Sequence, residues 1–236
     1  MVRNGAATIL RCVRSVTRQA YPGLEYLVLD GASDDGTVEI VRRHLRPVDC
    51  LISEPDRGVY DAMNKATRTA TGDFLLFLGA DDELVADLAE VAPRLVDAHT
   101  VYYGDAFWPR LGRRYDGPFD AAKLARRNIC QQAIFYPRSA FARHAFDLRY
   151  PLQADWELNM RLRSDPGFRL EYLPILVANY DDAGGMSSRL ADPVMEARYP
   201  GLLFRHFPPR VALPLAAASV AGRALRLLGL RRGGPA

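Results

Sequence analysis

The sequence lacks the features that mark several large classes of protein. It has three cysteines, Cys12, Cys50 and Cys130, whose spacing matches neither a zinc site nor a disulfide framework, which favours a reducing compartment. The longest apolar run near the C-terminus, residues 211–222, is broken by Pro214 and is shorter than the ~20 residues of a membrane-spanning helix. No apolar segment near the N-terminus has the form of a secretory signal. We therefore expect a cytoplasmic protein.

Motifs of several enzyme classes are missing as well. The sequence contains no G-x-S-x-G nucleophile elbow, no Walker A loop and no G-x-G-x-x-G fingerprint. Its four histidines show no metal-ligand spacing. A net charge of +3 is too small to indicate a nucleic-acid partner. These absences argue against a serine hydrolase of that type, a P-loop nucleotidase and a dinucleotide-binding enzyme.

What is present is the balance of a globular protein with an uneven charge distribution. The chain has 236 residues, of which 49% are hydrophobic and 25% charged, enough for one domain with an appendage. No acidic residue follows Glu196, whereas seven arginines do: Arg198, Arg205, Arg210, Arg223, Arg226, Arg231 and Arg232. We expect one domain over residues 1–190 and a basic helical tail over 191–236.

Short apolar strands alternate with amphipathic helices in the first half of the chain. Apolar runs predict strands at 26–29, 49–53 and 74–78, and helical periodicity predicts helices at 6–20, capped by Asn4, 37–46 and 58–70. This order is typical of parallel strands joined by right-handed crossovers. We expect an α/β fold with a mostly parallel sheet and helices on both faces.

The second half has a different pattern. Strands are predicted at 101–107, 133–136 and 170–180, with a hairpin and loop over 110–119. Helices are predicted at 154–164 and in the tail on either side of a break at Pro208 and Pro209.

Acidic residues follow three successive strands of the first half. They are Asp30, Asp56 and the pair Asp81–Asp82. Ligands of open α/β sheets bind along the carboxyl edge of the strands, where these residues would meet. Asp30 is either a turn residue or an acceptor for a base or ribose, and Asp56 with Arg57 either caps a helix or places a guanidinium near a phosphate.

The Asp81–Asp82 pair predicts a metal site. Adjacent carboxylates repel each other unless a cation or hydrogen-bond donors compensate, and carboxylate oxygens suit Mg²⁺ or Mn²⁺. The functional interpretation is a cation that holds a diphosphate, and the alternative is a helix cap.

Asp155 is the candidate general base. It precedes Trp156, and desolvation by an aromatic ring raises the pKa of a carboxyl group. The alternative is an acidic residue at a helix N-terminus that pairs with Arg161 or Arg163.

Seven segments then carry a resemblance to a known family. They are VLDGASDDGT (28–37), SEPDRGVYDAMNKA (53–66), DFLLFLGADDEL (73–84), VYYGDAF (101–107), NICQQAIFYPRSAF (128–141), FDLRYPLQADWELNMRL (146–162) and GGMSS (184–188). In this order they resemble an inverting glycosyltransferase of family 2 with the GT-A fold, of the kind that builds bacterial surface polysaccharides. The resemblance covers residues 3–190, with a nucleotide half (1–100) and an acceptor half (101–190). The absence of a Q-x-x-R-W motif argues against a processive synthase.

The resemblance implies a role for each candidate residue. Nucleotide binding falls to Asp30, Asp56, Arg57, Lys65 and Asp81, direct metal ligation to Asp82, and catalytic base function to Asp155. The acceptor side is assigned to Gln131, Gln132 and Trp156. The sequence departs from the family pattern at Ala154, where an acidic residue is common, and at Gln131, where histidine is common.

The resemblance also implies a loss at the N-terminus. Family members begin with an apolar strand of about six residues, of which only the end of the following loop, Arg3–Asn4, is recognisable here. Our hypothesis is a start site upstream of Met1, with a natural truncation as the alternative. We expect a gap in the sheet and a weakened base pocket.

The expected activity is therefore the transfer of a sugar from a nucleoside diphosphate sugar to a glycan or lipid-linked acceptor. We expect a UDP-sugar as the donor and Mg²⁺ or Mn²⁺ as the cofactor. Two other possibilities are a catalytically inactive, transferase-like binding module and a nucleotidyltransferase. For the arginine-rich tail, one hypothesis is peripheral contact with an anionic inner membrane leaflet, and the other is a solvated helix that packs on the domain.

Overall fold

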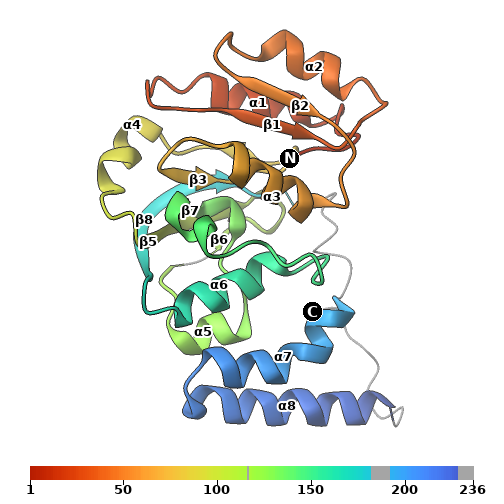
Figure 1. Cartoon of the computed structure of the whole chain (residues 1–236), viewed down its shortest axis with the longest axis vertical. Coiled ribbons are helices and arrows are strands. Elements are labelled where there is room, and N and C mark those ends of the chain that lie inside the picture. Colours follow the sequence, from red (N-terminus) through yellow and green to blue (C-terminus); the bar gives the residue numbers. More distant parts are fainter. Residues whose placement is uncertain (116, 182–191, 228–236) are drawn as a thin grey trace.

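The computed structural model describes residues 1–115, 117–181 and 192–227 (Figure 1). The GGMSS segment and the last nine residues of the tail lie outside the described residues. The elements of the first half are α1 (Ile9–Thr17), β1 (Leu27–Asp30), α2 (Thr37–His44), β2 (Cys50–Ser53), α3 (Val59–Thr69), β3 (Phe74–Leu76), β4 (Glu83–Leu84) and α4 (Leu88–Val91). The second half contains β5 (Thr100–Trp108), β6 (Arg113–Tyr115), α5 (Ala121–Arg126), β7 (Ile134–Pro137), α6 (Ala154–Ser164), β8 (Arg169–Asn179), α7 (Pro193–His206) and α8 (Pro209–Leu227).

The strands form two sheets rather than one. β1 and β2 pair in parallel, as expected for two strands joined by a helix. The second sheet has the order β3-β7-β5-β8-β4, with β6 on β5. Within it β5 and β8 are parallel, whereas β3 pairs antiparallel with β7. The expectation of a mostly parallel sheet is therefore confirmed only in part, because β3 finds its partner in the second half of the chain.

The predicted elements are confirmed within a few residues, with one wrong cap. Helix α1 is preceded by Thr8, with no side-chain cap, whereas Asn4 has a φ of 52° and its Oδ1 accepts a hydrogen bond from the amide of Asp34. A turn from Gly5 to Thr8 separates Asn4 from the helix, so its side chain joins the neighbouring loop instead.

The predicted gap in the sheet is present. Val2 forms an isolated parallel bridge with Asp30, and no other described residue pairs with that edge of β1. The N-terminus lies between β1 and β3 in Figure 1. The upper part of the molecule is thus joined to the larger sheet without a continuous strand between them.

The C-terminal helices pack against the domain. The described part of α8 lies along α7 at the bottom of Figure 1, and α7 contacts α6 while α8 contacts α5. Small or apolar side chains are buried along this interface, among them Leu203, Phe207, Ala212 and Ala216. Helix α7 ends at His206 and α8 begins at Pro209, so the break lies at Phe207–Pro208, within one residue of the predicted position.

Candidate active site

Asp30 is held at the carboxyl end of β1 by two serines. Its side chain is 3% exposed. Oδ1 accepts a 2.5 Å hydrogen bond from Ser33 Oγ, and Oδ2 accepts bonds from the Ser33 amide (3.0 Å) and from Ser53 Oγ (2.6 Å). Ser53 ends β2, so the paired parallel strands fix the carboxylate from both sides.

Asp56 lies directly against the residue that follows Asp30. A Cβ atom on Gly31 would lie 2.6 Å from Asp56 Oδ2, so the absence of a side chain at Gly31 allows this approach. Asp56 Oδ1 accepts a 2.8 Å hydrogen bond from the Gly58 amide ahead of α3. The structure therefore brings Asp30 and Asp56 together at one edge, as the sequence predicts.

The two basic residues predicted for nucleotide binding, Arg57 and Lys65, are engaged with neighbouring protein groups. Arg57 pairs with Asp61 one turn along α3, at 3.0 Å, and its side chain is largely exposed. Lys65 Nζ lies 2.8 Å from Glu54 Oε1 and 2.8 Å from the Pro55 carbonyl. Lys65 thus holds the loop that carries Asp56.

Asp81 and Asp82 follow β3 and differ in accessibility. Asp82 is fully buried, and its oxygens accept bonds from the amides of Gly79 (2.7 Å) and Asp181 (3.3 Å) and from the Gln132 side chain. Burial, followed by the charge of Asp81, raises the pKa of Asp82 to about 6. Asp81 is only half-buried, and burial also raises its pKa.

The chemistry of this pair fits a divalent cation. Burial raises the pKa of both neighbouring carboxyl groups, and the nearby positive charges of Arg11 and the Met1 amino group only partly offset this for Asp81. Among the described residues, no three His, Cys, Asp or Glu side chains surround one metal position. The pair fits an ion such as Mg²⁺ or Mn²⁺, which takes one or two carboxylates and completes its shell with phosphates and water.

Asp155 lies in the first turn of α6 and is held by two polar side chains. Oδ1 accepts a 2.6 Å hydrogen bond from Tyr60 Oη, and Oδ2 accepts a 2.5 Å bond from Asn128 Nδ2. Burial raises the pKa of Asp155, while the bonds from Tyr60 and Asn128 lower it. A carboxylate with a raised pKa and a fixed orientation is suited to accept a proton.

A second layer of amides and a phenol fixes Asn128. Asn159 Nδ2 donates to Asn128 Oδ1 at 2.8 Å, and Tyr136 Oη donates to Asn159 Oδ1 at 2.9 Å. Because Oδ1 of Asn128 accepts a bond, its Nδ2 must face Asp155. The chain Tyr136–Asn159–Asn128–Asp155 is a continuous hydrogen-bond network that runs from the buried Tyr136 and Asn159 to the half-buried Asn128 and Asp155.

The segment 128–132 connects Asp155 with Asp82. Asn128 binds the former and Gln132 the latter, and Cys130 Sγ donates to Gln132 Oε1 at 3.3 Å. Four residue steps of extended chain span at most about 14 Å. The two carboxylates are therefore held by the two ends of one short segment.

The other acceptor-side candidates have different surroundings. Gln131 is buried, and its Nε2 lies 3.7 Å from Met63 Sδ. Trp156 donates from Nε1 to the Leu124 carbonyl, and its ring packs on Tyr199 of α7. The aromatic residue that touches Asp155 is therefore Tyr60.

Sequence reasoning missed Tyr60, Asn128 and Asn159. All three lie in or beside segments quoted for the resemblance, at GVYDAMN, NICQQ and WELNM. Their side chains are neutral, so they do not stand out as candidate acids, bases or metal ligands. They are also far apart in the sequence, so only the folded structure shows that they lie together.

The sequence was compared with known families and relatives. The profile of glycosyl transferase family 2 matches residues 1–168. The chain belongs to glycosyltransferase family 2. A PGL/p-HBAD biosynthesis glycosyltransferase of Mycobacterium tuberculosis is 37% identical over 206 residues, which cover 84% of this chain and 80% of the relative. An uncharacterized glycosyltransferase of the same species is 30% identical over 212 residues, covering 84% and 79%.

Solved structures share the fold. S. aureus TarS 1-349 in complex with UDP aligns with a TM-score of 0.63 at 18% identity, over 87% of this chain and 64% of that one. The chain thus spans slightly less than two thirds of that TarS structure. The mannosyltransferase PcManGT from Pyrobaculum calidifontis, in complex with GDP-Man and Mn²⁺, aligns with a TM-score of 0.63 at 22% identity, over 94% and 73%.

These likenesses confirm the family and the GT-A fold expected from the sequence. This family 2 member is a glycosyltransferase, and the carboxylates described above belong to its domain. Among the described helices, none is both long and apolar enough to cross a membrane.

Proposed function

We propose that this glycosyltransferase moves a sugar from a nucleoside diphosphate sugar to a hydroxyl group of a glycan or lipid-linked acceptor. The proposed donor is a UDP-sugar. The configuration at the anomeric carbon of the sugar is inverted during the transfer. The observation that carries the proposal is the link between Asp155 and Asp82 through Asn128 and Gln132. Through this link, the segment 128–132 binds the proposed proton acceptor at one end and one carboxylate of the proposed cation-binding pair at the other. The neighbours that hold UDP or GDP-Man support the donor class.

The donor end of the proposed site comprises Asp30, Asp56, Arg57, Lys65 and Asp81. Asp30 and Asp56 present carboxylate oxygens that can accept bonds from the base or ribose of a nucleoside. Lys65 positions the loop of Asp56 through Glu54 and Pro55. Arg57 is exposed and provides positive charge at the rim.

The Asp81–Asp82 pair would hold Mg²⁺ or Mn²⁺, with Asp82 as the direct ligand inferred from the family motif. A bound cation would supply positive charge to the departing diphosphate. Asp81 is the more accessible member of the pair and is therefore available as a second ligand.

The proposed chemistry is a single displacement. Asp155 takes the proton of the acceptor hydroxyl as the oxygen attacks the anomeric carbon, the bond from that carbon to the diphosphate oxygen breaks, and the nucleoside diphosphate leaves with the electron pair. Tyr60 and Asn128 keep the carboxylate oriented during this step. Gln131, Gln132 and Trp156 are proposed for the acceptor side.

A thermal-shift panel tests the donor assignment. The melting temperature of the protein is measured with UDP, GDP, dTDP and CMP, each with and without Mn²⁺. We expect a rise for one nucleoside diphosphate that requires the cation. If no nucleotide raises the melting temperature, the protein is better described as the inactive binding module.

We also propose that α8 rests on an anionic membrane surface near a lipid-linked acceptor. Leu213 and Val220, two helical turns apart on α8, are each 57% exposed, and Arg205 on α7 and Arg210 on α8 are exposed as well. The proposal is tested by co-sedimentation with phosphatidylglycerol vesicles. Leu213→Ser/Val220→Ser should reduce binding, and the control pair Val48→Ser/Val96→Ser, exposed elsewhere, should not. Absence of binding by the unmodified chain would leave α8 as a solvated helix.

A further inference from the structure

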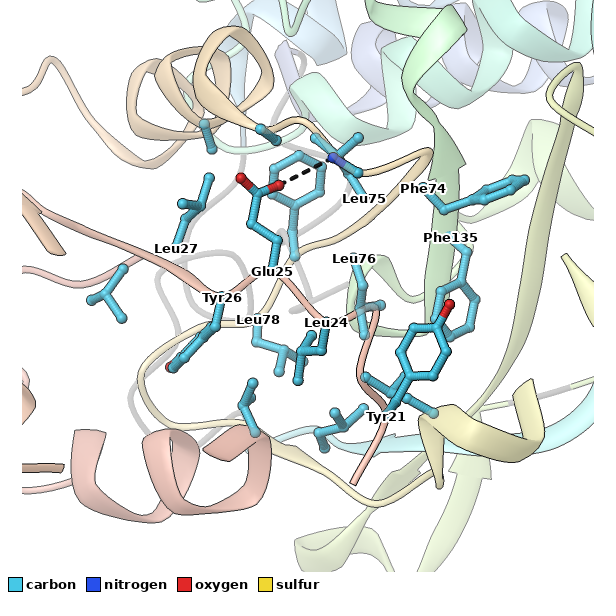
Figure 2. Close-up of a pocket in the computed structure, with 18 of the residues that line it drawn as sticks. Tyr21, Leu24, Glu25, Tyr26, Leu27, Phe74, Leu75, Leu76, Leu78 and Phe135 are labelled. Atoms are coloured by element: carbon cyan, nitrogen blue, oxygen red, sulfur yellow. Dashed lines mark hydrogen bonds between the residues drawn. The ribbon is translucent and has the colours of Figure 1, made fainter. Parts of the chain in front are cut away.

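The apolar groove between β1 and β3 is unsuited to a sugar acceptor (Figure 2). Its labelled side chains are mainly leucine, phenylalanine and tyrosine, whereas the hydroxyl groups of a buried sugar need hydrogen-bond partners. The carboxylate drawn there, Glu25, already accepts bonds from the amides of Thr71 (2.8 Å) and Gly72 (3.1 Å). Neither Asp155 nor Asn128 lines the groove. An acceptor that gives its proton to Asp155 must therefore contact a different surface.

A chain of contacts leads from Asp155 to the hairpin formed by β5 and β6. The Tyr115 hydroxyl at the end of β6 donates to the Asn128 carbonyl at 2.8 Å, and the Asn128 side chain binds Asp155. The Tyr115 ring lies edge-on to Trp108, with 5.2 Å between ring centroids, and Trp108 lies 5.6 Å from Tyr180. All three rings are partly exposed. Trp108, Tyr115 and Tyr180 thus form an aromatic cluster beside the proposed base.

The aromatic cluster also adjoins the proposed cation site. Tyr180 precedes Asp181, whose amide donates to Asp82 at 3.3 Å. Tyr115 binds the first residue of the segment 128–132, and the last residue of that segment, Gln132, binds Asp82. An acceptor hydroxyl must lie near both the base and the donor sugar when it reacts. The cluster is therefore well placed to contact the acceptor.

Two guanidinium groups lie over rings of the aromatic cluster. Cζ of Arg127 is 4.2 Å from the centroid of Tyr115, and Cζ of Arg113 is 5.8 Å from that of Trp108. Burial raises the pKa of Tyr115, the hydrogen bond and charge of Arg127 lower it, and the charge of Asp155 raises it. The charges of Arg127 and Asp155 thus act on the same phenol, which places Arg127 close to the base.

Positive charge is concentrated in this part of the chain. Residues 108–127 contain six basic and two acidic residues, a net charge of +4, whereas the whole chain carries +3. One of the two acids, Asp120, caps α5, and its Oδ1 accepts a bond from the Lys123 amide. Arg113 is exposed and forms no ion pair with any described residue. Such a surface attracts anionic groups, which guanidinium groups bind through paired hydrogen bonds.

The aromatic cluster holds an unused hydrogen-bond donor. Nε1 of Trp108 is buried, and no described residue accepts a bond from it. A buried donor without a partner costs free energy, so a ligand oxygen that accepts its bond gains affinity. A sugar ring presents C–H groups on its faces and oxygen atoms at its edge. These match an aromatic ring and an N–H donor, respectively.

We propose that the aromatic cluster, together with Arg113 and Arg127, binds an acidic sugar of the acceptor. The rings contact the C–H face of this sugar, and the guanidinium groups bind its carboxylate or phosphate. A neighbouring hydroxyl of the same sugar then faces Asp155. The inference rests on the proposed function, because it assigns the acceptor class of that reaction.

Binding of small sugars tests the proposal without catalysis. Methyl glucoside, methyl glucuronide, glucose 6-phosphate and inorganic phosphate are titrated into the parent protein, and dissociation constants are obtained from NMR chemical shifts. We expect at least one acidic sugar to bind about ten-fold more tightly than methyl glucoside and to shift the indole N–H signal of Trp108. The two acidic sugars distinguish a carboxylate site from a phosphate site. Arg113→Gln should remove the preference, and the control Arg42→Gln, an exposed change on α2, should retain it.

Several outcomes would overturn the proposal. One is equal binding of neutral and acidic sugars, and another is an unchanged preference in Arg113→Gln. If inorganic phosphate binds as tightly as glucose 6-phosphate, the surface binds anions without contacting a sugar. If Arg113→Gln abolishes binding of the nucleoside diphosphate, Arg113 belongs to the donor side. Since the sugar titrations need no donor, binding of acidic sugars by a protein that binds no nucleotide would support this site and contradict the proposed transfer.

Discussion

The hydroxyl of Tyr60 in α3 donates a 2.6 Å hydrogen bond to Oδ1 of Asp155 in α6, a residue 95 positions further along the chain. Together with the 2.5 Å bond from Asn128, it fixes both oxygens of the proposed base. The two halves of the glycosyltransferase domain thus meet at one carboxylate. Changes to this carboxylate and to its neighbours should therefore have different effects on turnover, binding and pH dependence.

Removal of the proposed base should affect turnover and not donor binding. We expect Asp155→Asn to lower the rate of nucleoside diphosphate release from the donor by about 10²- to 10⁴-fold, because a positioned general base contributes rate enhancement of that size. The dissociation constant of the nucleoside diphosphate should stay within about two-fold. Glu171→Gln, an exposed change on β8, is the control and should alter neither quantity. Equal losses of binding and turnover in Asp155→Asn would contradict the assignment.

Loss of the Tyr60 hydroxyl should change the pH profile. Its hydrogen bond favours the charged form of Asp155, so Tyr60→Phe raises the pKa of that carboxyl beyond the increase caused by burial. Because the base must be deprotonated to act, the acid limb of kcat/KM should move to higher pH by about one unit.

The matched control for this change is Tyr102→Phe. Tyr102 is also buried, and its hydroxyl accepts a bond from the amide of Asp97, whereas the Tyr60 hydroxyl donates to Asp155. This variant should keep the acid limb of the parent protein. If Tyr60→Phe lowers the activity but leaves the acid limb of the kcat/KM profile at the same pH, the Tyr60 hydroxyl has a structural role only.

A single methyl group should disturb the proposed nucleoside end. The Cβ of Gly31→Ala would lie 2.6 Å from Asp56 Oδ2, so the Asp56 side chain must move away from Asp30. We expect nucleoside diphosphate binding to weaken by about ten-fold, as measured by calorimetric titration. In the control Gly72→Ala, the nearest atom is 3.7 Å away, and binding should be unchanged.

The junction of α7 with α6 should weaken in acid. Nδ1 of His206 lies 2.7 Å from Ser164 Oγ, and no described residue bonds its buried Nε2. Burial lowers the pKa of His206 to about 4, from about 6.5 in the unfolded chain. Between these values the unfolded chain binds the proton and the folded chain does not, so this stabilisation is complete above pH 6.5 and is lost as the pH falls toward 4.

Melting curves from pH 7.5 to 4.5 measure this effect. The melting temperature of the parent protein should fall with pH more steeply than that of His206→Gln, which cannot titrate. Parallel curves for the two proteins would show that His206 does not contribute to the acid sensitivity.

Local sequence patterns predicted the elements well and their pairing less well. Helix α6 was predicted with the bounds that the structure has, and β1, β2 and α3 within one or two residues, because the period of apolar residues is a local property. The antiparallel pairing of β3 with β7 joins residues about 60 positions apart, and no local pattern specifies it. The misplaced cap at Asn4 has a similar cause, since its partners belong to the loop after β1.

The candidate site was predictable where charge marked it. Asp30 ends β1, Asp56 and Asp81 lie in the loops after β2 and β3, and Asp155 lies in the first turn of α6, in the order that the sequence predicts. The polar side chains that orient Asp155 are neutral, and Tyr60 and Asn128 reach it from different elements. Trp156 is adjacent to Asp155 in the sequence, but its indole packs against α5 and α7.

The most direct test of the account is a titration of the nucleoside diphosphate selected by the thermal-shift panel, with Mn²⁺, into the parent protein and into Asp81→Asn, Asp82→Asn and Asp155→Asn. The account predicts that Mn²⁺-dependent binding is lost in Asp82→Asn, weakened in Asp81→Asn and retained in Asp155→Asn. Unaltered Mn²⁺-dependent binding in Asp82→Asn, or its loss in Asp155→Asn, would contradict the proposed division between a cation-holding pair and a separate base.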